Sequence, residues 1–137
     1  MFKYYYIIIM ATNYLSIFNE HFVDFVNDIQ TVFPENVDIL TAKNSLLAVR
    51  KANPKLLVRI WLKYIAIPYK DEIETGNINF FIDKDYGADL ARSGNKDKIM
   101  EAVDRLRNPI KEMSSIEQIK SMKYIQNLSK LAALVPA

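Results

Sequence analysis

The sequence predicts an all-α protein, an irregular bundle of about five to six helices in a single domain. Apolar residues recur at intervals of three and four along most of the chain, which is the spacing of amphipathic helices. The 137 residues include only three glycines, too few for the many tight turns of a β-sandwich. This length suits one domain, and the 50% hydrophobic and 25% charged composition is that of an ordinary globular protein.

The composition also excludes several kinds of active site. The chain has no cysteine, so disulfides, cysteine-ligated metals and thiol nucleophiles are excluded. Its glycines match neither the dinucleotide-binding nor the P-loop pattern. The one histidine, His21, stands beside Phe22 on an apolar helix, which favours a half-buried, hydrogen-bonded side chain over a catalytic base. We therefore expect no catalytic residue, no cofactor and no resident metal.

Residues 1–10 differ from the rest of the chain. The apolar run from Tyr4 to Met10 is shorter than the roughly 20 residues of a membrane span, and it lacks the cleavage site of a signal peptide. Tyrosine and isoleucine in series favour a strand. Met10 followed by Ala11 is a credible start of translation. We expect residues 1–10 to be an extension that contributes little to folding, and residues 11–137 to form the helical domain.

Three helices are predicted in the first half of the chain. The first runs from Asn13 to Pro34, the second covers residues 36–52, and the third starts at Pro54 and is kinked or stopped at Pro68. The second is expected to bury Val37, Leu40 and Leu47, with some of Ile39, Leu46 and Val49, and the third to bury Leu57, Ile60, Trp61 and Tyr64.

The second half contains the clearest periodicity. Residues 70–95 are irregular, with a turn at Gly76, a short helix at residues 78–82 and a loop at residues 83–94. A helical stripe follows, made of Ile99, Val103, Leu106, Ile110 and Met113, with Pro109 inside it. Ser114 and Glu117 fit a capping box that begins a last helix. Its predicted buried face consists of Ile116, Ile119, Met122, Ile125, Leu128 and Leu131.

Two further patterns allow a functional and a structural interpretation. Asp83, Asp85 and Asp89 form an incomplete calcium loop, and they could instead hold magnesium in a phosphate-directed enzyme. We expect solvated loop carboxylates and keep that magnesium site as a weak alternative. The aromatic residues Trp61, Tyr64, Tyr69, Phe80 and Phe81 could stack nucleic-acid bases, but at helical spacing they are expected to belong to the core.

Charge is strongly segregated along the chain, although the net charge is only +2. Residues 43–70 contain seven basic residues and no acidic one, whereas residues 4–38 contain five acidic residues and no lysine or arginine. A basic face of this kind can contact phosphates, nucleic acid or an acidic protein. Its candidate residues are Lys51, Lys55, Arg59 and Lys63, with Lys120, Lys123 and Lys130 as further possibilities.

The alternative is that the charges neutralise one another inside the molecule. Glu20, Asp24 and Asp28 form an acidic stripe on the first helix, and Lys55, Arg59 and Lys63 form a basic stripe of equal length on the third. If these helices are neighbours, the stripes could face each other over about 12 Å. We expect this internal pairing rather than a nucleic-acid surface.

Four strings resemble sequences of small, uncharacterised helical proteins of large DNA viruses that infect algae and protists. The strings are Ala52-Asn53-Pro54-Lys55-Leu56-Leu57, Asn79-Phe80-Phe81-Ile82, Asp104-Arg105-Leu106-Arg107-x-Pro109-Ile110 and Ser121-Met122-Lys123-Tyr124-Ile125-Gln126-Asn127-Leu128. This resemblance covers roughly residues 14–131. It implies a protein of the host cytoplasm, the viral factory or the virion, and it implies no activity.

These observations lead to one expected function and one alternative. We expect a non-enzymatic interaction module that acts through protein–protein contacts, with no membrane association and with self-association left open. The alternative is a nucleic-acid-associated factor that uses the basic face of residues 43–70.

Overall fold

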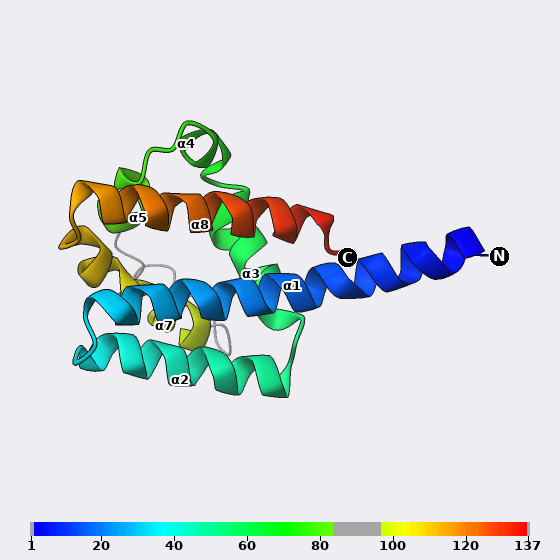
Figure 1. Ribbon diagram of the computed structural model, residues 1–137, viewed down its shortest axis with the longest axis horizontal. Helices are drawn as coiled ribbons and strands as arrows, with labels where there is room; N and C mark the ends of the chain where they lie inside the picture. Colours follow the sequence, from blue (N-terminus) through cyan, green and yellow to red (C-terminus); the bar gives the residue numbers. More distant parts are fainter. Residues whose placement is uncertain (1, 84–96, 137) are drawn as a thin grey trace.

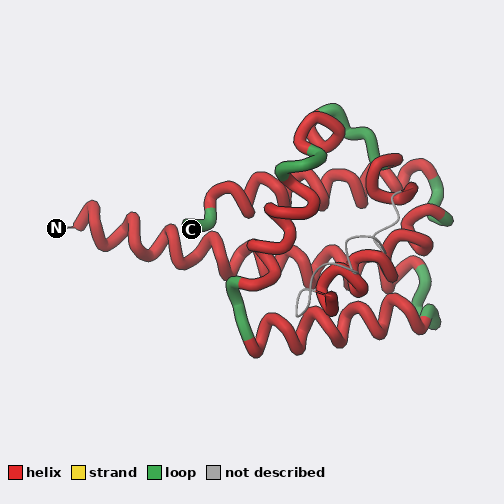
Figure 2. Tube along the Cα trace, turned by 180° about the vertical axis from the view of Figure 1, so that it is seen from behind, coloured by secondary structure: helices red, strands yellow, loops and turns green. Residues whose placement is uncertain are grey.

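The computed structural model describes residues 2–83 and 97–136, and every element within these ranges is helical (Figure 2). The prediction of an all-α, single-domain fold is confirmed. The helices are α1 (Phe2–Val32), α2 (Val37–Ala52), α3 (Leu56–Trp61), the π-helical turn η1 (Leu62–Ala66), α4 (Lys70–Glu74), α5 (Asn79–Asp83), α7 (Asp97–Lys111) and α8 (Ser115–Leu134).

Helix α1 lies between α8 and α2 and packs against both, while α7 packs against α2 (Figure 1). Its first turns project beyond the rest of the molecule (Figure 1). The composition of residues 1–10 favoured a strand. This prediction was wrong, because residues 2–10 belong to α1. A helix that is already formed gains one backbone hydrogen bond with each added residue, whereas a lone strand has no partner with which to pair. That residues 1–9 contribute little to folding stays a prediction.

Local hydrogen bonds fix where the helices begin. The Asn36 side chain accepts a hydrogen bond from the Ile39 amide at 3.1 Å and caps α2. The predicted capping box is present at α8, where the Glu117 amide donates to Ser114 Oγ at 3.3 Å and the Ser114 amide donates to Glu117 Oε1 at 3.1 Å. Helix α3 begins at Leu56, later than predicted.

The core is formed by one face of each long helix. The α7 stripe is buried as predicted over its whole length, with Leu106 and Ile110 fully inaccessible. Trp61 lies among these faces, with its ring edge-on to that of Phe22 at a centroid distance of 5.3 Å. Its indole Nε1 donates a hydrogen bond to Ser129 Oγ at 3.1 Å, which joins α3 to α8. These contacts hold α3 and η1 against the bundle.

Two predicted buried faces were partly wrong. In α2 the buried residues are Ile39, Ala42 and Leu46, while Val37 and Leu40 are exposed. In α8 the buried residues are Ser121, Met122, Ile125, Leu128 and Ala132, and Leu131 is half-buried. Ile116 and Ile119 are 80% and 61% exposed, because they lie about 180° and 120° around the helix from Ile125, which faces the core.

The short elements agree with the sequence where they are described. Gly76 has φ of +75°, the left-handed conformation that suits glycine at a turn. The predicted helix at residues 78–82 is present as α5. Helix α4 was not predicted. Most of the predicted loop, including Asp85 and Asp89, lies outside the described residues.

Candidate partner-binding surface

The basic stripe lies on the outer side of α3 and η1. Lys55, Arg59 and Lys63 are exposed, whereas Leu57 and Trp61 on the opposite side are buried in the core. The two faces separate because residues four apart in a helix share a side, and those two apart lie on nearly opposite sides. The sequence therefore placed these three cations correctly on one exposed face.

The start of this stripe is anchored to α1. Asn19, which is buried in α1, donates a hydrogen bond from Nδ2 to the Pro54 carbonyl at 3.0 Å. Asn53 accepts a hydrogen bond from the Lys55 amide at 3.3 Å and forms the turn between α2 and α3. Lys51, in the last turn of α2, is exposed just before this turn. The four candidate cations thus follow one another along the chain from the last turn of α2 to η1, and each is exposed.

These four cations have no ionic partner in the part of the chain that is described. No carboxylate oxygen of a described residue lies within 4.0 Å of the charged nitrogens of Lys51, Lys55, Arg59 or Lys63. Lys63 Nζ lies 5.4 Å from the centroid of the Tyr64 ring, a cation–π contact that leaves the charge at the surface. Within the described residues, these four charges are therefore not neutralised by an ion pair.

The expected pairing of this stripe with the acidic stripe of α1 was wrong. Asp28 pairs instead with Lys120 of α8, with Oδ2 and Nζ 2.9 Å apart, and the hydrogen bond and negative charge of Asp28 raise the pKa of Lys120. Glu20 and Asp24 are exposed without an ionic partner among the described side chains. Helices α1 and α3 meet through their apolar faces, at Phe22 and Trp61, so their charged faces point away from each other.

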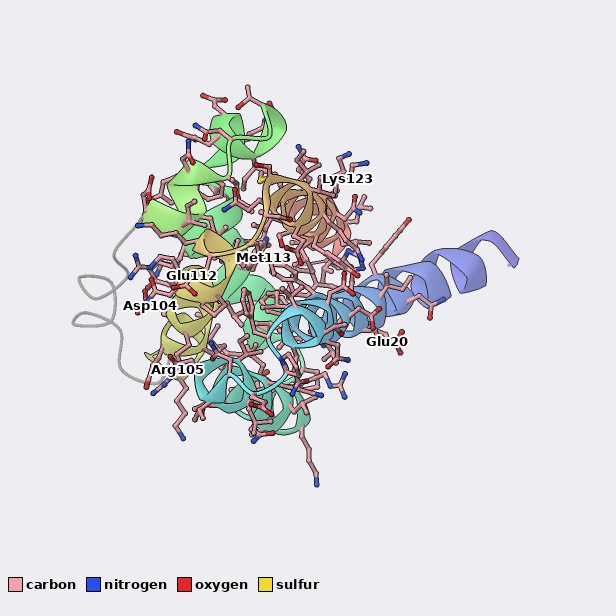
Figure 3. The ribbon with its side chains drawn as sticks, turned by 60° about the vertical axis from the view of Figure 1, so that its left-hand side comes forward. Glu20, Asp104, Arg105, Glu112, Met113 and Lys123 are labelled. Atoms are coloured by element: carbon pink, nitrogen blue, oxygen red, sulfur yellow. The ribbon has the colours of Figure 1, made fainter. Side chains whose placement is uncertain are left out.

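Other basic residues are neutralised within the fold. Arg105 donates to Asp38 at 2.7 Å and to Glu101 at 3.1 Å, and these hydrogen bonds raise the pKa of its guanidinium. Figure 3 shows Arg105 where α7 meets α2. Arg107 donates to Asp104 at 3.2 Å and to the Ile82 carbonyl at 3.3 Å. The unpaired state of the basic stripe is therefore not shared by the arginines of α7.

His21 is half-buried, as predicted, between α1 and α8. Its ring lies 4.9 Å from that of Tyr124, measured between centroids. Burial lowers the pKa of His21, against the smaller opposing effect of Asp24, and burial also raises the pKa of Tyr124. The His21 Nε2 atom is buried without a hydrogen-bond partner, so that part of the prediction was wrong.

The proposed base-stacking platform does not form. Trp61 and Phe81 are buried, and Tyr69 and Phe80 are partly buried and stacked on each other at 4.9 Å. Tyr64 is half-buried beneath Lys63. The core interpretation of these aromatic residues is confirmed, because the half-buried rings of Tyr64, Tyr69 and Phe80 also pack against the buried core.

Of the three aspartates of the predicted loop, only Asp83 lies within the described residues. Asp83 is exposed, with Oδ1 4.0 Å from Lys111 Nζ, and the other two aspartates lie outside the described residues. Within residues 13–83 and 98–136, no three histidine or acidic side chains come together as a metal site would require.

In comparisons with known proteins, no family model, no curated sequence and no solved structure matches this chain. Across the described residues, no helix combines the length and the apolar character needed to cross a membrane.

One surface feature was missed by the sequence interpretation. Ile67, which follows η1 and precedes Pro68, is 70% exposed and lies four residues after Lys63. Its signal in the sequence was its position outside the regular spacing of the buried residues Leu57, Trp61 and Ile65. An exposed isoleucine beside an unpaired cation combines apolar and basic character on one surface.

Proposed function

We propose that this protein is a non-enzymatic helical interaction module that binds an acidic protein surface through Lys51, Lys55, Arg59 and Lys63. The observation that carries this proposal is that all four cations are exposed, with no carboxylate of a described residue within 4.0 Å. A cluster of unpaired like charges raises the rate of encounter with a partner of opposite charge and helps to select it.

A protein partner fits this surface better than a nucleic acid for two reasons. The aromatic residues that could stack bases are used in the core. Ile67 adds exposed apolar area next to Lys63, and burial of apolar area stabilises a protein–protein contact but gains little against a phosphate backbone. The resemblance noted in the sequence extends the proposal to a partner in the virion or viral factory.

The second candidate function is association with nucleic acid. The observation in its favour is the i, i+4, i+8 spacing of Lys55, Arg59 and Lys63, which spreads three free cations over about 12 Å of helix. Such a surface would bind phosphates with an affinity that falls steeply as salt concentration rises, because binding releases counterions.

One experiment separates these functions. The full chain is affinity-purified, with and without nuclease, from cells infected by the virus that the resemblance implies, and the co-purifying proteins are compared. A protein partner that survives nuclease treatment and is lost with Lys55→Glu/Arg59→Glu supports the proposal. The matched control is Lys98→Glu/Lys111→Glu, which reverses two cations on α7 and should leave the partner bound. Loss of every partner on nuclease treatment would support the nucleic-acid function instead.

A further inference from the structure

An apolar groove lies next to the basic surface, between η1, α4 and α8. It has a volume of about 510 Å³, within the range of protein pockets that bind ligands. Its walls include Leu62, Ala66 and Ile67 on one side and Ala133 on the other, with Ile73 at the α4 end. The groove therefore offers aliphatic surface that this part of the chain leaves open.

Hydrogen bonds fix the groove at two points. Gln126 Nε2 of α8 donates to the Ile73 carbonyl of α4 at 2.9 Å. Trp61 Nε1 donates to Ser129 Oγ of α8 at 3.1 Å, at the start of η1. Helix α4 and the junction of α3 with η1 are thus both attached to α8. A groove that is already formed loses less conformational entropy on binding than one that must be assembled.

The π-helical turn sets the position of the η1 wall. The Ile67 amide donates to the Leu62 carbonyl at 3.0 Å, a hydrogen bond that spans five residues instead of four. A π-turn is rare and is frequently found at functional sites. In this protein Ile67 follows the π-turn directly and is 70% exposed, whereas Ile65 within the turn is buried.

Two lysines of α8 lie on the same side of the helix, one of them in the groove. Lys130 lines the groove, and Lys123 precedes it by seven residues, which places the two within about 20° of each other around the helix. Neither has a carboxylate of a described residue within 4.0 Å. Figure 3 shows Lys123 on the outer side of α8. The remaining charged residues of the groove, Lys70 and Glu74, pair with each other at 3.9 Å.

We infer that this groove binds an amphipathic helix of a partner protein, with leucine-like residues facing Leu62, Ala66 and Ile67 and acidic residues facing Lys123 and Lys130. The two lysines are separated by about 10 Å along α8, which matches two acidic residues seven apart on a partner helix lying along it. This inference rests on the proposed function, because both assume a protein partner.

The test uses two synthetic helical peptides that differ only in charge. Both carry leucines at i, i+3, i+4 and i+7, and one carries glutamates, the other lysines, at two flanking positions seven residues apart. Binding to the full-length protein is measured by fluorescence anisotropy and located by backbone amide chemical shifts. The glutamate peptide should bind about tenfold or more tightly than the lysine peptide, and it should shift the amides of Leu62, Ala66 and Ala133.

Variants of the protein sharpen this test. Ala133→Trp should fill the groove and lower the affinity for the glutamate peptide by about tenfold or more. Ile67→Ser should lower this affinity by about fivefold or more. The matched control is Ile119→Ser, another exposed isoleucine, which should bind normally. Lys123→Glu/Lys130→Glu should reverse the preference between the two peptides. Each altered residue is exposed, and thermal melting verifies that each variant is folded.

Three results would overturn the inference: equal binding of both peptides, no binding at millimolar protein concentration, or binding that Ala133→Trp leaves unchanged. If Lys55→Glu/Arg59→Glu abolishes peptide binding while Ala133→Trp does not, the peptide occupies the basic stripe. The inference that the groove binds the peptide is then wrong, whereas the proposed function of the basic residues is still supported. If only the groove variants lower the affinity for the peptide, the inference holds, and it does so even if the basic stripe binds a different partner.

Discussion

Helices α7 and α3–η1 use basic residues in opposite ways. Both bury one apolar face in the same core, and both carry cations on the other side. Arg105 and Arg107 of α7 donate hydrogen bonds to carboxylates of α2 and of α7 itself. Lys55 and Arg59 of α3 contact no carboxylate of the described chain.

The difference shows that the position of a cation on a helix does not indicate its role. Arg105 lies where α7 packs on α2, so Asp38 is within its reach. The basic stripe of α3 lies on the side that no other described helix covers with acidic residues. We therefore assign a structural role to the arginines of α7, and for the stripe of α3 we keep the proposed binding role.

The largest expected effect concerns the core that both helices share. Leu106 of α7 is fully buried, so Leu106→Ala should lower the free energy of unfolding by about 2–5 kcal/mol through lost burial and a cavity. Lys98→Ala, at an exposed position of the same helix, should change it by less than about 0.5 kcal/mol. Urea unfolding measures both, and equal losses would mean that α7 does not bury this face.

A smaller effect should distinguish the arginines directly. Arg105→Ala removes hydrogen bonds to two carboxylates and should cost about 1 kcal/mol, since partly exposed pairs contribute modestly. Arg59→Ala removes no ionic contact to any residue that the structure describes and should cost less than about 0.5 kcal/mol. The loss of unfolding free energy in Arg105→Ala should be smaller at 1 M salt, because exposed charges are screened there. If Arg59→Ala proves the more costly, the assigned roles are reversed.

His21 differs from both groups of cations, because its Nε2 atom is buried and has no hydrogen-bond partner in the described structure. We therefore expect the stability of the protein to depend on pH. Because burial lowers its folded-state pKa, the unfolded chain binds the proton more readily, and stability rises with pH. This contribution is complete above the unfolded pKa of about 6.5 and is lost as pH falls through the lower folded pKa. Melting temperatures between pH 7 and 5 should decline less in His21→Phe than in the wild type. Identical slopes would show that His21 is solvated in the folded state.

The smallest expected effect is on the stability of the proposed binding surface itself. Lys55→Glu/Arg59→Glu should change the free energy of unfolding by less than about 0.5 kcal/mol, because neither cation has an ionic partner among the described residues. Reversal of Arg105 to glutamate, beside Asp38 and Glu101, should be clearly destabilising. A marked loss of stability in the α3 variant would show that its stripe is neutralised within the molecule after all.

Much of the secondary structure could be predicted because its causes are local. The capping box at Ser114 and the turn at Gly76 depend on side chains and dihedral angles within a few residues. The α7 stripe was clear because its apolar residues occupy one face and its other face is almost entirely polar. In α2 and α8 apolar residues lie on more than one face, so spacing alone could not show which face would be buried.

The candidate site was only partly visible in the sequence. The exposure of Lys51, Lys55, Arg59 and Lys63 follows from helical periodicity and was predicted. The partners of charged residues were not predictable, because Asp28 meets Lys120 across more than 90 residues of chain. The groove was not predicted either, since it requires α4 and η1 to lie beside α8.

By itself, the sequence determined the helical class of this protein, most of its helix boundaries, the buried stripe of α7 and the segregation of its charge. The tertiary structure decided which faces of α2 and α8 are buried, leaving Val37 and Ile116 exposed. It also decided that α1 and α3 meet through Phe22 and Trp61, so that their charged stripes face outward. The physical reason is that periodicity fixes the angle between residues on one helix, whereas only the packing of helices fixes which angle faces the core.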